Sequence, residues 1–563
     1  MNAERLLEHY HRIADAPDAI ARLRRFVFDL AVRGKLMPQD AADEPASELL
    51  KRIAKEKARL VKAGEINAGK PLPPVDSDAD FDVPSGWRWT RLGVITSYIQ
   101  RGKSPKYAAS NGSLVVSQKC VQWTGLDLTV AKQITLDSLA DYEPVRFLRD
   151  GDLLWNSTGT GTIGRVIRIV DPPEKLVCDS HVTVVRCLEV APEYVRTWLR
   201  SDHVYALIEG RAAGSTNQVE LTARMAINQV VPLPPLAEQY RLVTKVDELM
   251  ALCDRLEAAR AGREAKRDRL TAASLARLNA PDPETFQADA RFALDALAAL
   301  TTRPDQIRQL RQTILNLAAR GKLVPQDPND EPASELLKRI AADKAERAVS
   351  ARDRRATKIK PLAGDEVPFP LPSNWVWASF GDITISRDGE RIPVSREERE
   401  QRAKVYDYYG ASGVIDKIDG YLFDKPLLLI GEDGANLINR STPIAFIARG
   451  KYWVNNHAHV LDGLSRGFLR YVELFINAID LKPYVTGTAQ PKMNQAKMNS
   501  IPVAVPPLAE QHRVVAKVDE LMALCDGLEA SLDAAGTTSR RLLDALLAEA
   551  LAQDDARELE AAE

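Results

Sequence analysis

A stretch of 25 residues that occurs twice organises this chain. The first copy, residues 234–258, reads PPLAEQYRLVTKVDELMALCDRLEA, and the second, residues 506–530, reads PPLAEQHRVVAKVDELMALCDGLEA. Apolar residues recur in both copies at the a/d spacing of a helix that packs on another helix. They are Val246, Leu249, Cys253 and Leu256 in the first copy and Val518, Leu521, Cys525 and Leu528 in the second. A helix over about 236–276, roughly 60 Å long at 1.5 Å per residue, is therefore predicted.

A second repeat lies upstream of each copy. Residues 31–40 read AVRGKLMPQD and residues 318–327 read AARGKLVPQD, and the same shift of 287 residues carries DEPASELLKRIA from Asp43 onto Asp330. Each block follows another a/d series, which consists of Ile20, Leu23, Val27 and Leu30 in the first and Ile307, Leu310, Ile314 and Leu317 in the second. Self-similarity over such lengths indicates a duplicated structural unit.

The segments between the repeated blocks have diverged. They share little beyond their entrances, SGWRW and SNWVW, and their β-branched runs, such as HVTVVRCLEV and TPIAFIA, predict short strands. We therefore expect an α+β fold with two mixed α/β domains, separated by long antiparallel helices in a coiled-coil scaffold, and a pseudo-two-fold internal repeat. The expected regions are helical at 1–84, 234–372 and 506–563, with the mixed domains at 85–233 and 373–505.

Composition excludes several classes of protein. The 563 residues are 45% hydrophobic and 27% charged, with a mean hydropathy of −0.25, as in soluble globular proteins. No apolar stretch approaches the roughly 20 residues that span a bilayer, and the polar N-terminus is unlike a signal peptide. Five cysteines without a CxxC pair fit neither a disulfide framework nor a zinc knuckle. These features predict a cytoplasmic protein with reduced cysteines, among which Cys253 and Cys525 are core residues.

The repeated motifs resemble those of a known family. PPLAEQ entering a long helix occurs at Pro234 and Pro506, the RGKL-PQD block also occurs twice, and a G[ST]xxQ-like element precedes each PPLAEQ, at 214–218 and 487–490. In these features the whole chain resembles the specificity subunits of type I restriction-modification systems. The resemblance implies a non-catalytic protein with two target-recognition domains, each of which reads one half of an asymmetric bipartite site in double-stranded DNA.

The same resemblance implies the partners. The antiparallel helices would set the spacing of the two half-sites and bind two methyltransferase subunits and, in the larger complex, the restriction subunits. S-adenosylmethionine, ATP and Mg²⁺ would then be bound by those partners and no cofactor or metal by this chain. The formal net charge of −2 argues at first against a DNA-binding protein. Residues 85–231 nevertheless carry 17 basic and 14 acidic residues and residues 373–505 carry 16 and 15, which suits DNA affinity shared with partners.

Base reading requires polar and basic side chains presented on loops. In the first domain the Gly- and Pro-broken loop 100–107, the polar residues 117–119 and the run 156–160 meet this requirement, and in the second the loop 386–391 and the residues 455–459 do so. The predicted DNA-binding residues are Arg101, Lys103, Lys106, Gln118, Lys119, Thr160, Asn217 and Gln218 in the first domain and Arg387, Arg391, Asn456, His457, Gln490 and Lys492 in the second.

Motifs of enzymes are incomplete in this sequence. Residues 159–164 match GxGxxG, but RVIRIV continues as a strand where the dinucleotide fingerprint needs a helix, so a turn is predicted. The DPPE run at 171–174 lacks the aromatic fourth residue of amino-methyltransferase loops, and Gly34-Lys35 lacks the flanking residues of a phosphate loop. Ser157, Asp179 and His181 lack the GxSxG elbow of a hydrolase.

Two alternatives remain open at this stage. A helical adaptor protein with two peptide-binding inserts would use the same architecture without binding DNA in a sequence-dependent way. A DNA-reading subunit could also serve a different arrangement, such as a fused nuclease-methyltransferase.

Overall fold

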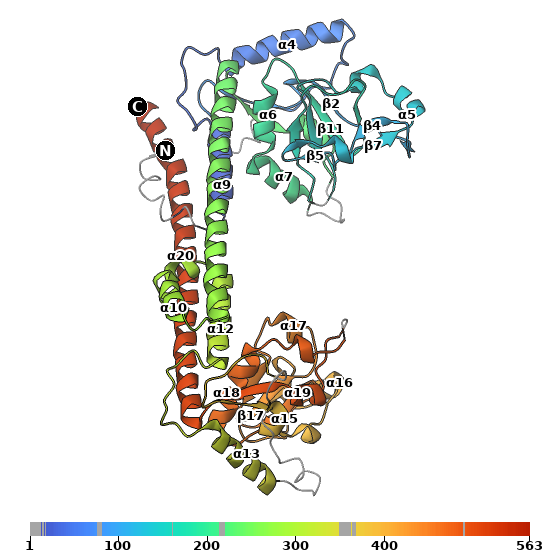
Figure 1. Ribbon diagram of the computed structural model, residues 1–563. Helices are drawn as coiled ribbons and strands as arrows, with labels where there is room; N and C mark the ends of the chain where they lie inside the picture. Colours follow the sequence, from blue (N-terminus) through green and yellow to red (C-terminus); the bar gives the residue numbers. More distant parts are fainter. Residues whose placement is uncertain are drawn as a thin grey trace. The chain divides into compact units, whose positions relative to one another are not determined.

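The computed structural model describes residues 13, 16, 18–75, 81–159, 161–212, 220–347, 362, 367–487 and 490–562 (Figure 1). The chain forms two compact units, one of residues 1–262 with 536–563 and the other of residues 263–535. Each unit combines helices from the repeated blocks with one sheet-containing domain, so the predicted α+β fold with two mixed domains is confirmed. The division into five regions stays a prediction.

The domain of the first unit contains two four-stranded sheets. One has the order β2-β11-β8-β9 and is antiparallel throughout, and the other has the order β10-β4-β7-β3, in which β10 and β4 run parallel. The antiparallel pair β1-β12 joins the start of the domain to its end. The strands are β1 (Arg88–Arg91), β2 (Thr96–Arg101), β3 (Tyr107–Ala108), β4 (Ser113–Val116), β5 (Val121–Gln122), β6 (Gly125–Leu126), β7 (Lys132–Ile134), β8 (Leu153–Asn156), β9 (Val166–Arg168), β10 (Val177–Cys178), β11 (Val182–Cys187) and β12 (Val230–Leu233).

The domain of the second unit repeats this topology. Its antiparallel sheet has the order β14-β20-β17-β18, its second sheet has the order β16-β15-β19 with β15 and β19 parallel, and β13 pairs with β21. The strands are β13 (Val376–Ser379), β14 (Ile385–Ser386), β15 (Tyr406–Gly410), β16 (Gly413–Ile418), β17 (Leu427–Gly431), β18 (Ala445–Ala448), β19 (Tyr452–Val454), β20 (Ala458–Asp462) and β21 (Pro502–Val505). The two diverged segments thus form the same frame, in which β8 and β11 correspond to β17 and β20.

The helices follow the predicted pattern. The first long helix runs from Leu236 to Asn279 as α9, close to the predicted 236–276, and the second PPLAEQ copy opens α20 (Leu508–Ala562). The other helices of the first unit are α3 (Ala19–Val32), α4 (Ala46–Lys62), α5 (Leu136–Ala140), α6 (Pro192–Leu199), α7 (Asp202–Ala212) and α8 (Ala223–Asn228). Those of the second are α10 (Phe286–Asp295), α11 (Leu297–Leu300), α12 (Pro304–Ala319), α13 (Ala333–Arg347), α15 (Phe380–Ile383), α16 (Arg396–Glu400), α17 (Asn436–Asn439), α18 (Arg466–Ala478) and α19 (Gln495–Asn499).

Matched ion pairs join the helices within each unit. In the first unit Arg24 of α3 binds Asp254 and Glu257 of α9, whereas Asp43, further along the chain, binds Arg241 near the start of α9. Positions later in one segment therefore meet positions earlier in the other, which shows that α3 and this part of α9 are antiparallel. The equivalent pairs in the second unit are Arg311 with Asp526 and Glu529, and Asp330 with Arg513.

Three of the repeated motifs meet at one buried point in each unit. The Glu238 carboxylate of the first PPLAEQ accepts a hydrogen bond of 2.9 Å from the indole N–H of Trp87, the first Trp of SGWRW, and Trp87 also lies 3.1 Å from Gln39 of the RGKL-PQD block. In the second unit Glu510 accepts from Trp375 at 2.9 Å and from Gln326 at 2.7 Å. Each motif cluster fastens the start of a domain to the first turn of a long helix.

The glycine of the RGKL-PQD block is required by both backbone conformation and space. Gly34 has φ +72° and Gly321 has φ +64°, in the left-handed region that other residues rarely adopt. A Cβ at Gly34 would lie 2.5 Å from Cγ of Pro84, and a Cβ at Gly321 would lie 2.7 Å from Cγ of Pro372. The turn after each helix can therefore approach the entrance of the domain only because no side chain intervenes.

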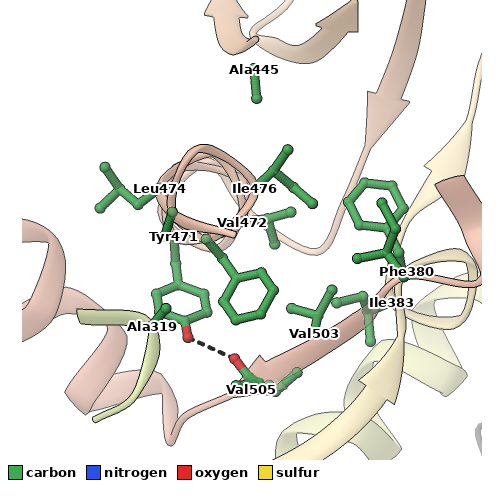
Figure 2. Close-up of a cluster of buried hydrophobic side chains, with 14 of the residues drawn as sticks. Ala319, Phe380, Ile383, Ala445, Tyr471, Val472, Leu474, Ile476, Val503 and Val505 are labelled. Carbon is green, nitrogen blue, oxygen red and sulfur yellow. Dashed lines mark hydrogen bonds between the residues drawn. The ribbon is translucent and has the colours of Figure 1, made fainter. Parts of the chain in front are cut away.

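The core of the second unit connects its domain to its helices. Figure 2 shows Val472 of α18 facing Phe380 and Ile383 of α15 and Val503 of β21, and all four side chains are buried. This cluster also includes Val518 of α20, together with residues of α12 and α13. The continuity of the apolar contacts means that the domain and the adjoining helices of the second unit share one core.

The structure also bears on two predictions from composition. Cys253 and Cys525 are buried, as expected for core residues at a/d positions. Within the part of the chain that the structure describes, no helix is both long and apolar enough to cross a membrane.

Candidate nucleic-acid interface

Several predicted residues of the first domain gather around the turn that joins β10 to β11, residues 179–181. The Arg101 guanidinium at the end of β2 donates to the carbonyl of Ser180 (Nε to O, 2.8 Å), and the backbone of Lys103 pairs with that of Asp179. On the other side of the turn, the ring of His181 contacts Thr158 of the loop after β8. We call the loop residues 101–106, 117–120, 157–159, 161–165 and 179–181 the first loop cluster.

The polar side chains of the first loop cluster are interconnected. The Thr158 hydroxyl lies 3.0 Å from Oε1 of Gln118 and 2.7 Å from Nδ1 of His181. Asn156 is buried and donates to the carbonyl of Gln118 at 3.0 Å, which fixes the Gln118 loop against the end of β8. Lys119 and His181 are exposed. The cluster therefore presents donors and acceptors on a hydrogen-bonded support.

The basic residues of loop 101–106 differ in how far they are engaged. Arg101 forms an ion pair with Glu220, and Nζ of Lys103 lies 2.7 Å from the carbonyl of Asp141. Lys106 is exposed, and its backbone N–H donates to the Ser138 hydroxyl at 3.0 Å. Lys103 also lies 3.4 Å from the carboxylate of Glu143, so the charges of Arg101 and Lys103 are both partly neutralised within the domain, a fact that the sequence did not reveal. Of the remaining predictions, Thr160, Asn217 and Gln218 lie outside the described residues.

The second domain presents an equivalent set of loops. Asn456 and His457 are exposed on the turn between β19 and β20, and Nδ1 of His457 lies 2.7 Å from the carboxylate of Asp433 in the loop after β17. Lys492 lies beside them, because its backbone pairs with that of Asp433, and Gln490 precedes it by two residues and is exposed. We call the loop residues 387–391, 432–434, 455–457, 486–487 and 490–493 the second loop cluster.

The second loop cluster rests on a buried network of charged groups. Arg391 is only 14% exposed and binds Glu432 at 2.9 Å, and Lys492 binds the other oxygen of Glu432 at 3.1 Å. Burial alone would raise the pKa of Glu432, but the hydrogen bonds from Arg391 and Lys492 and the charge of His459 outweigh burial and lower it. Arg391 therefore supports the cluster from within, although the sequence predicted it as a surface contact.

His459 is the most buried member of this network. Its Nδ1 lies 2.6 Å from the carboxylate of Asp388 and its Nε2 lies 2.9 Å from the carbonyl oxygen of Met493. Both neighbours are acceptors, so both ring nitrogens carry protons and the imidazole is positively charged. Burial lowers the pKa of His459, but the hydrogen bond to Asp388 and its charge, together with the carbonyl of Met493 and the charge of Glu432, outweigh burial and raise the pKa.

Arg387 has mainly an intradomain role in this structure. Its guanidinium binds both carboxylate oxygens of Glu390, at 2.6 and 2.7 Å, and contacts Asp462 at 3.4 Å. The predicted residues Asn456, His457 and Lys492 are brought together, whereas Arg387, although part of the second loop cluster, forms ion pairs with Glu390 and Asp462. Sequence reasoning missed Glu432 and Asp433, although both lie in the polar GEDG turn that directly follows a strand of four leucine and isoleucine residues.

The enzyme motifs that were set aside do not assemble into a catalytic site. The Ser157 hydroxyl bonds the hydroxyl of Thr183 at 2.5 Å, and residues 159 and 161–164 form a turn between β8 and β9. Asp179 accepts from the backbone N–H of His181 and not from its ring. The predicted turn at the GxGxxG match is therefore confirmed over its described residues, and Ser157, Asp179 and His181 each have the other partners named here.

Comparisons with known proteins agree with these features. Residues 372–534 match the model of the type I restriction modification DNA specificity domain. The specificity subunit of the type I restriction enzyme EcoEI from Escherichia coli is 29% identical over 576 residues, which cover 94% of each chain. That of EcoAI, also from Escherichia coli, is 29% identical over 571 residues, which cover 94% of this chain and 93% of the relative.

Solved structures of the same kind are also similar. The HsdS subunit from Thermoanaerobacter tengcongensis is 17% identical, with a TM-score of 0.42, over 84% of this chain and 98% of that chain. The family-domain match and the two full-length relatives agree with the duplicated motifs and the paired domains. Residues 372–534 thus match a type I restriction modification DNA specificity domain, and the chain is similar over most of its length to the specificity subunits of type I restriction enzymes.

Proposed function

We propose that the two loop clusters bind the two halves of an asymmetric bipartite site in double-stranded DNA. The observation that carries this proposal is that two domains with the same strand order present different side chains from equivalent loops. Thr158 and Asp433 occupy equivalent positions after β8 and β17, yet one is a hydroxyl and the other a carboxylate. A common frame with unlike loops suits recognition of two unlike base sequences, because base edges are read by the donors and acceptors that face them.

Methylation mapping tests this proposal directly. The chain would be co-expressed with its cognate methyltransferase subunit in a host without other DNA methylation, and modified bases would be mapped across the genome. We expect a single asymmetric motif with two specified parts around an unspecified spacer. A soluble complex that methylates no specific sequence would instead favour the helical adaptor with peptide-binding inserts.

Exchange of the residues in one loop cluster sharpens the test. Replacing Gln490 and Lys492 by alanine should change recognition or affinity through the second half-site and leave the specified bases of the first half-site unchanged. Lys119→Ala should behave differently. If this exposed cation contacts phosphate, its loss weakens binding to all DNA sequences alike and reduces the salt dependence of binding. Equal effects of both changes on both half-sites would contradict the assignment of one cluster to each half-site.

We further propose that the repeated long helices dock two methyltransferase subunits in equivalent ways and set the spacing between the half-sites. Exposed residues have no packing reason to stay identical in two copies, yet Lys245, Glu248 and Leu252 recur as Lys517, Glu520 and Leu524. Leu252 is 43% exposed and Leu524 is 59% exposed. An identical exposed face that includes a leucine on two helices fits two copies of one protein partner.

The docking proposal predicts a change in stoichiometry. Leu252→Glu or Leu524→Glu alone should reduce the complex from two methyltransferase subunits to one, and the double variant should bind none, as measured by native mass spectrometry. Arg255→Glu is the matched control, because this exposed position holds Gly527 in the other copy. Two bound methyltransferase subunits in the double variant would refute this docking face.

The remaining parts of the assembly belong to the same proposal. Restriction subunits would join the larger complex, S-adenosylmethionine, ATP and Mg²⁺ would be bound by the partner subunits, and the assembly would act in the cytoplasm. Isothermal titration of this chain alone with each of these three ligands, compared with titration of the complete complex, would test the assignment of cofactors. Binding by the isolated chain would contradict it.

A further inference from the structure

Both domains keep a histidine at the tip of the same turn. His181 ends the run Asp179-Ser180-His181 between β10 and β11, and His457 ends the run 455–457, Asn-Asn-His, between β19 and β20. Val182 pairs with Asn156 and Ala458 pairs with Gly431, so the two histidines occupy the same register position relative to the central strands. These segments have otherwise diverged, which makes the shared histidine informative.

Equivalent hydrogen bonds hold the two turns in place. The N–H of His181 donates to the carboxylate of Asp179 at 2.9 Å, and the N–H of His457 donates to the side-chain oxygen of Asn455 at 2.8 Å. The carbonyl oxygens of the two histidines accept from the backbone N–H groups of Ser157, at 2.8 Å, and Glu432, at 2.9 Å. Each histidine is therefore fixed against the loop that follows the adjacent central strand.

A glycine in the left-handed backbone conformation directly follows the residue that contacts each histidine ring. Gly159 and Gly434 both have φ +103°, a conformation that other residues rarely adopt. A Cβ at Gly159 would lie 2.3 Å from Oγ1 of Thr162. The residue that precedes each glycine, Thr158 or Asp433, contacts the histidine ring.

These contacts fix the same ring nitrogen as a donor in both domains. The Asp433 carboxylate can only accept, so Nδ1 of His457, at 2.7 Å, carries a proton. The Thr158 hydroxyl donates to Oε1 of Gln118 at 3.0 Å, which leaves the oxygen of Thr158 to accept from Nδ1 of His181 at 2.7 Å. In a neutral ring with a proton on Nδ1, Nε2 is a hydrogen-bond acceptor.

The acceptor nitrogen of each histidine is available for a ligand. Both rings are exposed, and the His457 side chain is 51% accessible to solvent. Within the described segments, Nε2 of neither ring is hydrogen-bonded to the protein. An acceptor on a fixed tip complements a donor group, and the donors on the major-groove edges of the bases are the N4 amino group of cytosine and the N6 amino group of adenine.

We infer that Nε2 of His181 and Nε2 of His457 each accept a hydrogen bond from the exocyclic amino group of a cytosine or adenine, one in each half-site. The inference rests on the proposed function and deepens it, since it names the specificity-determining side chains and the base group that they read. Thr158 and Asp433 act as positioning residues, because they orient the ring and set which nitrogen accepts.

Base analogues that lack the amino group provide the test. Once the recognition sequence is mapped, each specified adenine would be replaced by purine and each specified cytosine by 2-pyrimidinone, one position at a time. Binding of the complex of this chain with its methyltransferase would then be measured. We expect one such replacement in each half-site to weaken binding of the unmodified protein by about 5- to 150-fold.

The two histidines serve as controls for each other. In His457→Phe the loss caused by the replacement in one half-site should disappear, while the loss in the other half-site stays; His181→Phe should give the converse. Retained discrimination in the unaltered half-site shows that each variant is folded. Asp433→Ala and Thr158→Val should reduce the same discrimination through loss of ring orientation, and Thr158→Ser, which keeps the hydroxyl, should preserve it.

The outcomes separate this inference from the proposed function. If the unmodified complex binds all duplexes equally, the proposed function itself fails. The complex could instead recognise a bipartite site while the variants His181→Phe and His457→Phe still lose affinity at every base that lacks its amino group. In that case the proposed function stands and the role of the histidines is refuted. A uniform loss of affinity for all sequences in the variants would also refute base reading and indicate contact with the DNA backbone.

Discussion

Glu510→Ala gives a sharp test of how the second domain is fastened to its helix. Glu510 is 1% exposed, and it accepts from the indole of Trp375 at 2.9 Å and from the amide of Gln326 at 2.7 Å. Each hydrogen bond to a charged group contributes about 1.5–3 kcal/mol. Burial raises the pKa of Glu510, so removal of the carboxylate also relieves a desolvation cost, and we expect a net destabilisation of about 3 kcal/mol.

A loss of this size should be measurable in the second unit. For domains of 150–250 residues each kcal/mol shifts Tm by about 2–4 °C, so for the second unit, residues 263–535 and slightly larger, a decrease of at most about 6–12 °C is expected by calorimetry. Hydrogen exchange should increase first around Trp375 and Gln326. Glu238→Ala should produce the same change in the first unit, and Glu520→Ala, whose side chain is 58% exposed, should change Tm by less than about 1 °C. An unchanged Tm in Glu510→Ala would refute this account of the fastening.

Three further predictions concern stability. Gly321→Ala places a Cβ 2.7 Å from Pro372 at φ +64°, so it should lower the free energy of unfolding by about 1–3 kcal/mol in urea titrations; an unchanged midpoint would show that the turn relaxes. The pKa of His459 is raised above 6.5, so its stabilisation by Asp388 is present in full below pH 6.5 and is lost as the pH rises through the higher folded-state value. His459→Asn should remove that slope from Tm measured against pH, and an unaltered slope would assign it to another group. Phe380→Ala empties a fully buried position and should cost about 3–5 kcal/mol by urea titration, whereas a cost below about 1 kcal/mol would mean that the core collapses into the space.

The helices were predictable because their signals are local and repeated. The a/d spacing around Val246 and Val518 specifies which face of each helix is buried, and PPLAEQ marks the start, so α9 was predicted to within a few residues at its end. The family could be recognised for the same reason, since the motifs recur with their order intact. The buried states of Cys253 and Cys525 followed from periodicity alone.

The arrangement of the loops was decided by tertiary structure. The sequence predicted polar loops with Arg101, His457 and Lys492, but it could not show that Arg101 pairs with Glu220 or that Arg391 lies beneath the surface. Hydrogen bonds between residues far apart in the chain depend on strand order, and strand order leaves no local pattern in two segments that have diverged.

The sequence by itself therefore determined the duplicated helices, the presence of two mixed domains and the resemblance to the specificity subunits. The tertiary structure alone decided which side chains of those domains share a surface. Helical periodicity and motif repeats are properties of neighbouring residues, whereas the pairing of His181 with Thr158 and of His457 with Asp433 arises because adjacent strands bring distant loops to the same end of a sheet.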